Sequence, residues 1–177
     1  NYVVVVTVCT TLYCHVIVSL TGLNGTKARA TTHHVDDNCG QTCVAPDYVL
    51  VQPGARERLI EAMKQEIRAA LGGDPLANPE YPHIVNEKHA QRLHGLLEHA
   101  DILFGGRGDG LKLEPTLVAC SGRDEPVMQE EIFGPVLPVL TYGDFDALLT
   151  FLRTRPKSLA GYLFTRSTEH EDAFLKR

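Results

Sequence analysis

The stretch VAPDYVLVQPGARERLIEAMKQEIRAALGG, residues 44–73, contains a strand pattern followed directly by a helix pattern. The apolar run at 48–51 predicts a short strand, and the Pro53-Gly54 pair predicts the turn after it. Apolar residues then recur at three- and four-residue spacings from Leu59 to Leu71, which predicts a helix that ends at Gly72-Gly73. A strand followed by an amphipathic helix is the repeating unit of a sheet covered by helices.

The remainder of the chain continues this alternation. Further strands are predicted at 101–104, at 111–120 with an interruption at Pro115, and at 159–165. Further helices are predicted at 87–100 with Asn86 as N-cap, from the cap Asp144 through Leu152, and after a capping box that begins at Thr168. The sequence therefore predicts an α/β fold with a mainly parallel sheet flanked by helices.

Composition favours one globular domain. The 177 residues are 44% hydrophobic and carry a formal net charge of -5, and no stripe of Lys and Arg appears that would favour nucleic-acid binding. Five cysteines form an odd set without disulfide-framework spacing, so we expect reduced thiols and a cytoplasmic protein. The N-terminus does not resemble a secretory signal.

Residues 1–39 differ from the rest of the chain. The Val- and Thr-rich run at 1–23 favours two buried strands, although it is also about long enough to form a membrane-spanning helix. Residues 24–39 follow neither a strand nor a helix period and are expected to be loop. We therefore treat 1–39 as an N-terminal segment that precedes the main domain at 40–177.

Cys43 lies in Gly40-Gln41-Thr42-Cys43, just before a predicted strand, where a loop can present a thiol to a cleft. By residue type alone, a lone cysteine is more often an inert small hydrophobe than a nucleophile. The tetrapeptide, however, resembles the nucleophile motif of the aldehyde dehydrogenase superfamily. Its continuation through Leu50 resembles the class-three branch, which implies medium- and long-chain aliphatic or aromatic aldehydes as substrates.

A second stretch, PVMQEEIFGPV at 126–136, is similar to the segment that contacts the cofactor in that family. The resemblance implies that Glu131 accepts hydrogen bonds from the nicotinamide ribose and that Phe133 lies against the nicotinamide of NAD or NADP. His89 lies in a stretch that resembles the family more weakly. We predict no catalytic or cofactor role for it, because a histidine on a helix is more often a surface or capping residue.

The mechanism that the resemblance implies is covalent catalysis. The Cys43 thiolate adds to the aldehyde to form a thiohemiacetal, hydride leaves for the nicotinamide, and water opens the resulting thioester. The backbone N–H groups around Cys43 are expected to help stabilise the oxyanion.

Several parts of the family pattern have no match here. Residues 18–27 resemble the segment of the general base but contain no Glu, and no residue matches the oxyanion-stabilising Asn. A dinucleotide-binding domain and the hairpin through which family members pair as homo-oligomers are also unmatched. We therefore expect 40–177 to be a partial catalytic domain that is inactive alone.

Two alternatives remain open at this point. His33, His34, Cys39 and Cys43 have residue types that suit zinc, although their spacing matches no common zinc pattern. The second alternative is a membrane-tethered interaction module that residues 1–23 anchor. The preferred aldehyde, the choice between NAD and NADP, and the oligomeric state are not determined by the sequence.

Overall fold

The computed structural model describes residues 4–8, 38–43 and 45–176, so most of the predicted loop at 24–39, including His33 and His34, lies outside the described residues. The described strands are β1 (Val4–Val8), β2 (Pro46–Val51), β3 (Asp101–Phe104), β4 (Gly108–Asp109), β5 (Lys112–Leu113), β6 (Thr116–Cys120), β7 (Val136–Thr141) and β8 (Ala160–Phe164). The helices are α2 (Pro53–Leu71), α3 (Glu87–Leu97), α4 (Phe145–Arg153) and α5 (Thr168–Leu175), with a short 3-10 turn at Pro126–Met128.

Six strands form the main sheet, in the order β3-β6-β7-β2-β1-β8, and β4 pairs with β5 in a separate hairpin. The three central strands are parallel: β6 pairs with β7, and β7 pairs with β2. The outer pairs, β3 with β6, β2 with β1, and β1 with β8, are antiparallel. The predicted α/β class is confirmed, with parallel pairing at the centre of the sheet.

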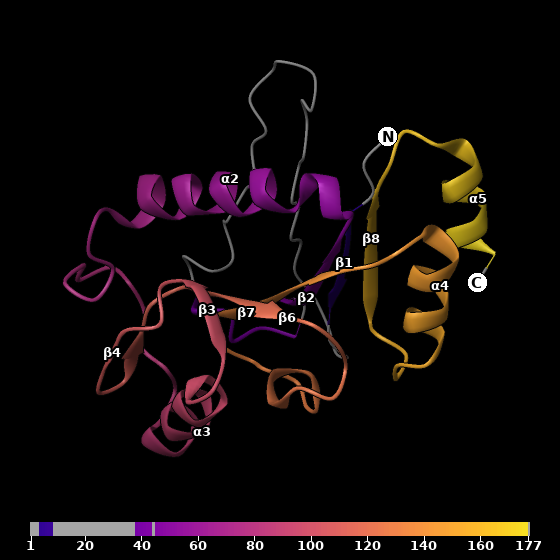
Figure 1. The fold of residues 1–177 in the computed structure, drawn as a ribbon. Coiled ribbons are helices and arrows are strands. Elements are labelled where there is room, and N and C mark those ends of the chain that lie inside the picture. Colours follow the sequence, from indigo (N-terminus) through magenta and orange to yellow (C-terminus); the bar gives the residue numbers. More distant parts are fainter. Residues whose placement is uncertain (1–3, 9–37, 44, 177) are drawn as a thin grey trace.

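Helices cover both faces of this sheet, with α2 along one face and α3 on the other (Figure 1). Side chains alternate between the faces along a strand. Val49 and Val51 of β2 accordingly pack in a cluster with Leu59 and Met63 of α2. Leu50 belongs to the opposite cluster, together with buried residues of α3 and α4.

The strand β7 is absent from the sequence prediction, although it lies between two parallel neighbours. Pro138 lies inside it, and a proline within a run usually argues against a central strand because it cannot donate to a neighbour. Here Pro138 is aligned with Val118 of β6, and the pairing with β2 begins at the next residue, Val139. The predicted strand at 111–120 is divided at Pro115 into β5 and β6, which belong to different sheets.

Helix caps follow the prediction at two of three places. Asn86 Oδ1 accepts the His89 N–H at the start of α3, and Asp144 Oδ1 accepts the Ala147 N–H at the start of α4. The predicted cap at Thr168 is wrong by one residue, because Ser167 accepts the His170 N–H and Thr168 is already helical.

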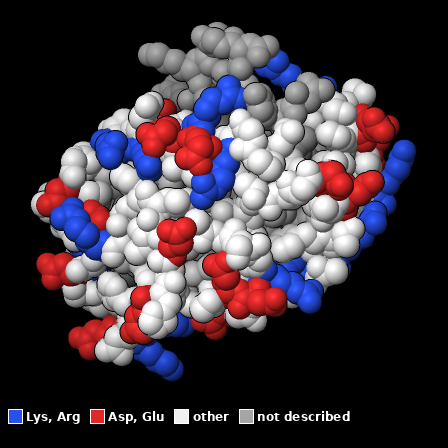
Figure 2. Space-filling view, in the orientation of Figure 1, with Lys and Arg blue, Asp and Glu red and all other residues white. Residues whose placement is uncertain are grey.

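Of the two strands expected at 1–23, one is present as β1, and residues 9–23, where the other would lie, are outside the described part of the chain. Among the described residues, no helix combines the length and apolar character needed to cross a membrane. On the face shown in Figure 2, acidic and basic side chains are interspersed.

Candidate active site

The two motifs found in the sequence both immediately precede strands of the parallel core. Cys43 lies in the loop before β2, and Glu131 and Phe133 lie in the segment before β7. Since β2 and β7 are adjacent and parallel, they begin at the same edge of the sheet. We call this the amino edge. The topology therefore brings together two segments that are far apart in the sequence.

The loop 38–43 is held in a tight conformation by its own polar groups. The Gln41 N–H donates to the Asn38 carbonyl at 3.0 Å, and the Asn38 side chain donates to the Gln41 carbonyl at 3.2 Å. The Gln41 side chain donates to the His83 carbonyl at 3.0 Å and accepts from the Val85 N–H at 2.8 Å. Gln41 thus links the loop 38–43 to the segment before α3.

Gly40 makes the closest approach between the two motifs. It has φ +68°, and a Cβ at this position would lie 2.3 Å from the Gly134 carbonyl oxygen. Only a residue without a side chain permits this packing. A small cavity of about 50 Å³ beside it is lined by both segments, with Gly40 and Ala45 from one and Gly134 and Pro135 from the other.

Two cysteines of this loop have different environments. Cys39 is 0% exposed, and its thiol donates to the Pro82 carbonyl at 3.0 Å. Cys43 is half-buried and carries a free thiol. Cys43 is therefore the more exposed residue of the two.

The predicted cofactor residues differ in exposure and backbone conformation. Glu131 is exposed, and among the described residues no hydrogen bond or ion pair engages its carboxylate. Phe133 is half-buried with φ +52°, a left-handed conformation that costs a non-glycine residue about 1–3 kcal/mol. Such a conformation persists only where surrounding contacts enforce it.

Those contacts come from His89 and Arg92, for which the sequence predicts no role in the site. The His89 ring Nε2 lies 2.6 Å from the Phe133 carbonyl oxygen, and the two rings make an edge-to-face contact with centroids 6.3 Å apart. Arg92, one turn further along α3, donates to the Glu131 carbonyl at 3.3 Å and also to the Ile132 carbonyl. The spacing of His89 and Arg92 on one helix face was a signal in the sequence, but nothing there indicated which segment they face.

Asp47, at the start of β2, links the two segments electrostatically. Its Oδ1 accepts the Ile132 N–H at 3.1 Å. Burial raises the pKa of the Asp47 carboxyl above its usual range, and the nearby charge of Glu131 raises it further, whereas the Ile132 hydrogen bond and the charge of Arg155 lower it. The amino edge therefore holds two carboxylates that are not equivalent, one partly buried and one exposed.

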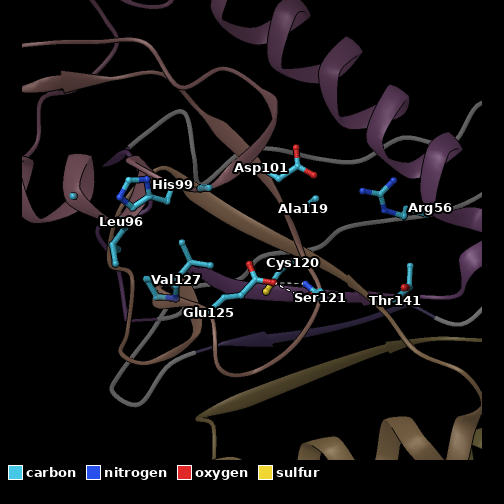
Figure 3. A pocket seen from close by; sticks show the side chains of 13 residues that line it. Arg56, Leu96, His99, Asp101, Ala119, Cys120, Ser121, Glu125, Val127 and Thr141 are labelled. Carbon is cyan, nitrogen blue, oxygen red and sulfur yellow. Dashed lines mark hydrogen bonds between the residues drawn. The ribbon is translucent and has the colours of Figure 1, made fainter.

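A larger hollow of about 570 Å³ lies at the opposite edge of the sheet, where β6 and β7 end. Glu125 accepts the Ser121 N–H at 2.5 Å and the Ser121 hydroxyl at 2.7 Å there, beside Cys120 (Figure 3). Burial raises the pKa of the Cys120 thiol to about 11, which makes it a poor nucleophile at neutral pH. The hollow is lined by neither Cys43 nor Glu131 nor Phe133, so it is separate from the candidate site.

Metal binding receives no support from the described part of the chain. Among those residues, no group of three or more His, Cys, Asp or Glu is arranged to hold a metal ion. His33 and His34, on which the zinc alternative depends, lie outside them.

Comparison with known proteins extends the sequence resemblance to most of the chain. Residues 21–177 match the model of the aldehyde dehydrogenase family. A 4,4'-diaponeurosporen-aldehyde dehydrogenase of Staphylococcus aureus is 46% identical over 132 residues, which are 72% of this chain and 29% of that protein. Human aldehyde dehydrogenase family 3 member B2 is 41% identical over 142 residues, 79% of this chain and 37% of that protein.

Solved structures agree with this comparison. A substrate-bound Staphylococcus aureus AldH superimposes with a TM-score of 0.78 at 40% identity, over 82% of this chain and 32% of that one. An NADP-dependent glyceraldehyde-3-phosphate dehydrogenase from Bacillus halodurans, complexed with NADP, gives 0.58 at 28% identity over 67% of this chain and 26% of that one. The chain spans about a third of the length of the first two relatives. The chain belongs to the aldehyde dehydrogenase family, and its first relatives include members of family 3.

Proposed function

We propose that residues 40–177 form part of the catalytic domain of an NAD(P)-dependent aldehyde dehydrogenase, in which Cys43 is the nucleophile. The observation that carries the proposal is the meeting of the Cys43 loop and the Glu131–Phe133 segment at the amino edge, through the contact of Gly40 with Gly134. Cys43 is a free cysteine that is not fully buried, which is compatible with attack on an aldehyde.

The residues present fit a dinucleotide cofactor. The exposed Glu131 carboxylate has no partner among the described residues, so its oxygens are available to accept hydrogen bonds from sugar hydroxyls. Phe133 supplies an aromatic surface beside it, on a backbone whose carbonyls are already bound by His89 and Arg92. The B. halodurans enzyme is NADP-dependent and was solved with NADP, which supports a nicotinamide dinucleotide, NAD or NADP, as the cofactor.

The chemistry assigned to the chain is bond formation at Cys43. Its thiolate adds to the aldehyde carbon, and the carbonyl oxygen becomes an oxyanion that backbone N–H groups of the loop can stabilise. A bound nicotinamide supplies the hydride acceptor. Glu131 and Phe133 orient that acceptor and limit its positions. By resemblance to the class-three branch, the substrates are aliphatic or aromatic aldehydes.

Alkylation of Cys43 tests the nucleophile directly. We expect iodoacetamide to modify Cys43 quickly and saturating benzaldehyde to slow that reaction at least five-fold, because the aldehyde adds reversibly to the same sulfur. Peptide mapping by mass spectrometry follows each cysteine. Cys120 is the internal control, since a pKa of about 11 in place of 9.0 leaves about 100-fold less thiolate.

Benzyl alcohol is the matched control compound, because it keeps the aromatic ring but lacks the carbonyl. Cys43→Ala must abolish the fast-reacting peptide without changing the modification of Cys120. Equal rates of Cys43 alkylation with benzaldehyde and with benzyl alcohol would refute the proposed nucleophile.

Turnover is a second measurement, followed as reduced cofactor formed from NAD or NADP with benzaldehyde. No Glu in residues 18–27 matches the family's general base, and loss of such a base typically slows a reaction by a factor of about 10²–10⁴. We therefore expect little or no steady turnover by the chain alone. Rapid turnover that requires Cys43 would contradict this expectation while supporting the assignment of Cys43.

A further inference from the structure

The helix α3 directs two side chains onto one short backbone segment before β7. His89 and Arg92 are three residues apart, so they lie on the same face of the helix. Arg92 donates to the carbonyls of Glu131 and Ile132, and the His89 ring contacts the carbonyl of Phe133. Three consecutive carbonyls are thus bound by two neighbouring side chains.

The same arrangement determines the tautomer of His89. The Arg92 Nε lies 3.4 Å from His89 Nδ1, and a guanidinium can only donate, so Nδ1 is the acceptor. The ring proton is therefore on Nε2, which donates to the Phe133 carbonyl at 2.6 Å. The main chain of His89 is fixed as well, because its N–H is capped by Asn86 Oδ1 at 2.9 Å.

Two further contacts lie at this segment, one to its main chain and one only to an exposed side chain. The Ile132 N–H is bound by Asp47, and Arg92 also forms an ion pair with Glu130 at 2.6 Å. The Glu130 side chain is 56% exposed, whereas the carbonyl contacts of Arg92 and His89 hold the main chain itself. Phe133 keeps its left-handed backbone conformation in the middle of these contacts.

We infer that Arg92 and His89 are positioning residues, which hold the Glu131–Phe133 segment in the conformation that presents the Glu131 carboxylate and the Phe133 ring to the cofactor. The inference rests on the proposed function. It adds that cofactor affinity depends on these two side chains of α3, although neither is assigned a contact with substrate or cofactor.

Hydrogen exchange of the segment tests whether the restraint exists. Arg92→Lys keeps the positive charge but loses the branched guanidinium that donates to two carbonyls. His89→Ala removes the ring N–H that donates to the Phe133 carbonyl. Both variants should exchange the Ile132 amide at least ten-fold faster, with amides of β8 as an internal reference for intact folding. His89→Gln retains an N–H donor and should restore protection. Glu130→Gln is the matched control and should remain within two-fold of the wild type.

Cofactor affinity tests whether the restraint matters for the site. Binding is measured by the fluorescence of NADH and NADPH added to the full chain, in parallel with thermal unfolding. Arg92→Lys and His89→Ala should weaken binding at least ten-fold without a matching change in unfolding temperature, while His89→Gln and Glu130→Gln bind as the wild type does.

The outcomes separate the two proposals. Unchanged exchange in Arg92→Lys and His89→Ala overturns the positioning inference, whatever the cofactor does. Faster exchange with unchanged cofactor affinity also overturns it, because the segment would then be restrained without consequence for the site. A wild-type chain that binds neither NADH nor NADPH refutes the proposal that the residues present bind the cofactor without the unmatched dinucleotide-binding domain, and the positioning inference falls with it even where exchange responds.

Discussion

Asp47 is a carboxylate that the fold keeps partly out of water beside a second carboxylate. Its acceptor oxygen is used by the Ile132 N–H, so its position is structural, yet its pKa is raised. A neutral group of the same shape would keep the hydrogen bond and avoid placing a charge near Glu131. A substitution can therefore remove the charge of Asp47 and keep the hydrogen bond that its oxygen accepts.

Asp47→Asn should raise the free energy of unfolding at pH 7, because the amide oxygen still accepts the Ile132 N–H and no charge is desolvated. The folded-state pKa lies above the unfolded value near 3.8, so the stability linked to Asp47 is fully present below that value and is lost as pH rises through the folded pKa. The advantage of the variant should therefore shrink as pH falls toward 4. Urea unfolding at pH 7 and pH 4, followed by circular dichroism, measures this change.

Glu131→Gln serves as the control for Asp47→Asn. It removes only the neighbouring charge and should give a smaller change of the same sign, since burial raises the Asp47 pKa more than Glu131 does. If the difference in the free energy of unfolding between Asp47→Asn and the wild type increased at low pH, burial would not be the cause of the raised Asp47 pKa.

The loop 38–43 and the segment before β7 form a pair of elements whose contact depends on a glycine. Gly40 combines a positive φ with direct contact against the Gly134 carbonyl. Gly110 also has a positive φ, +58°, but a Cβ there would meet nothing within 4 Å. A comparison of substitutions at the two glycines therefore distinguishes the cost of a left-handed backbone from the cost of close packing.

Gly40→Ala should destabilise the chain by about 1–3 kcal/mol more than Gly110→Ala, since both variants strain a left-handed backbone and only the first also overpacks a contact. Urea unfolding gives the two free energies. The rate of Cys43 alkylation should also change in Gly40→Ala alone, because the displaced loop carries Cys43. Equal losses of stability in the two variants would show that the loop moves away from Gly134 without penalty.

At the scale of the whole molecule, the sheet separates two hydrophobic clusters, and the larger joins α3, α4 and the strands between them. Leu148 of α4 is 0% exposed within it, whereas Leu175 of α5 is 73% exposed. The contribution of a leucine to stability therefore depends strongly on the layer in which it lies.

Leu148→Ala should lower the free energy of unfolding by about 2–5 kcal/mol, because it leaves a cavity in packed surroundings. Leu175→Ala, the same substitution at an exposed site, should change it by about 0.5 kcal/mol or less. Thermal or urea unfolding compares them. A similar loss for both variants would mean that α5 is packed more tightly than its exposure indicates.

Local structure was predictable wherever short-range forces determine it. The caps at Asn86 and Asp144 and the boundaries of β3 follow from neighbouring residues, and the structure has them as predicted. The strand β7 was missed because Pro138 weakens the local pattern, while pairing with strands on both sides stabilises it. Local preference was overridden there by partners distant in the sequence.

The sequence by itself determined the α/β class and carried the motifs around Cys43 and Glu131 that mark the family, because periodicity and motif spacing are local properties of the chain. Only the tertiary structure decided that the two motifs meet at one sheet edge and that His89, Arg92 and Asp47 restrain the segment before β7. His89 is 44 residues from Phe133 and Asp47 is 85 from Ile132, so these contacts depend on strand order. The order and parallel pairing of β2 and β7, which no local pattern specifies, bring these groups within hydrogen-bonding distance.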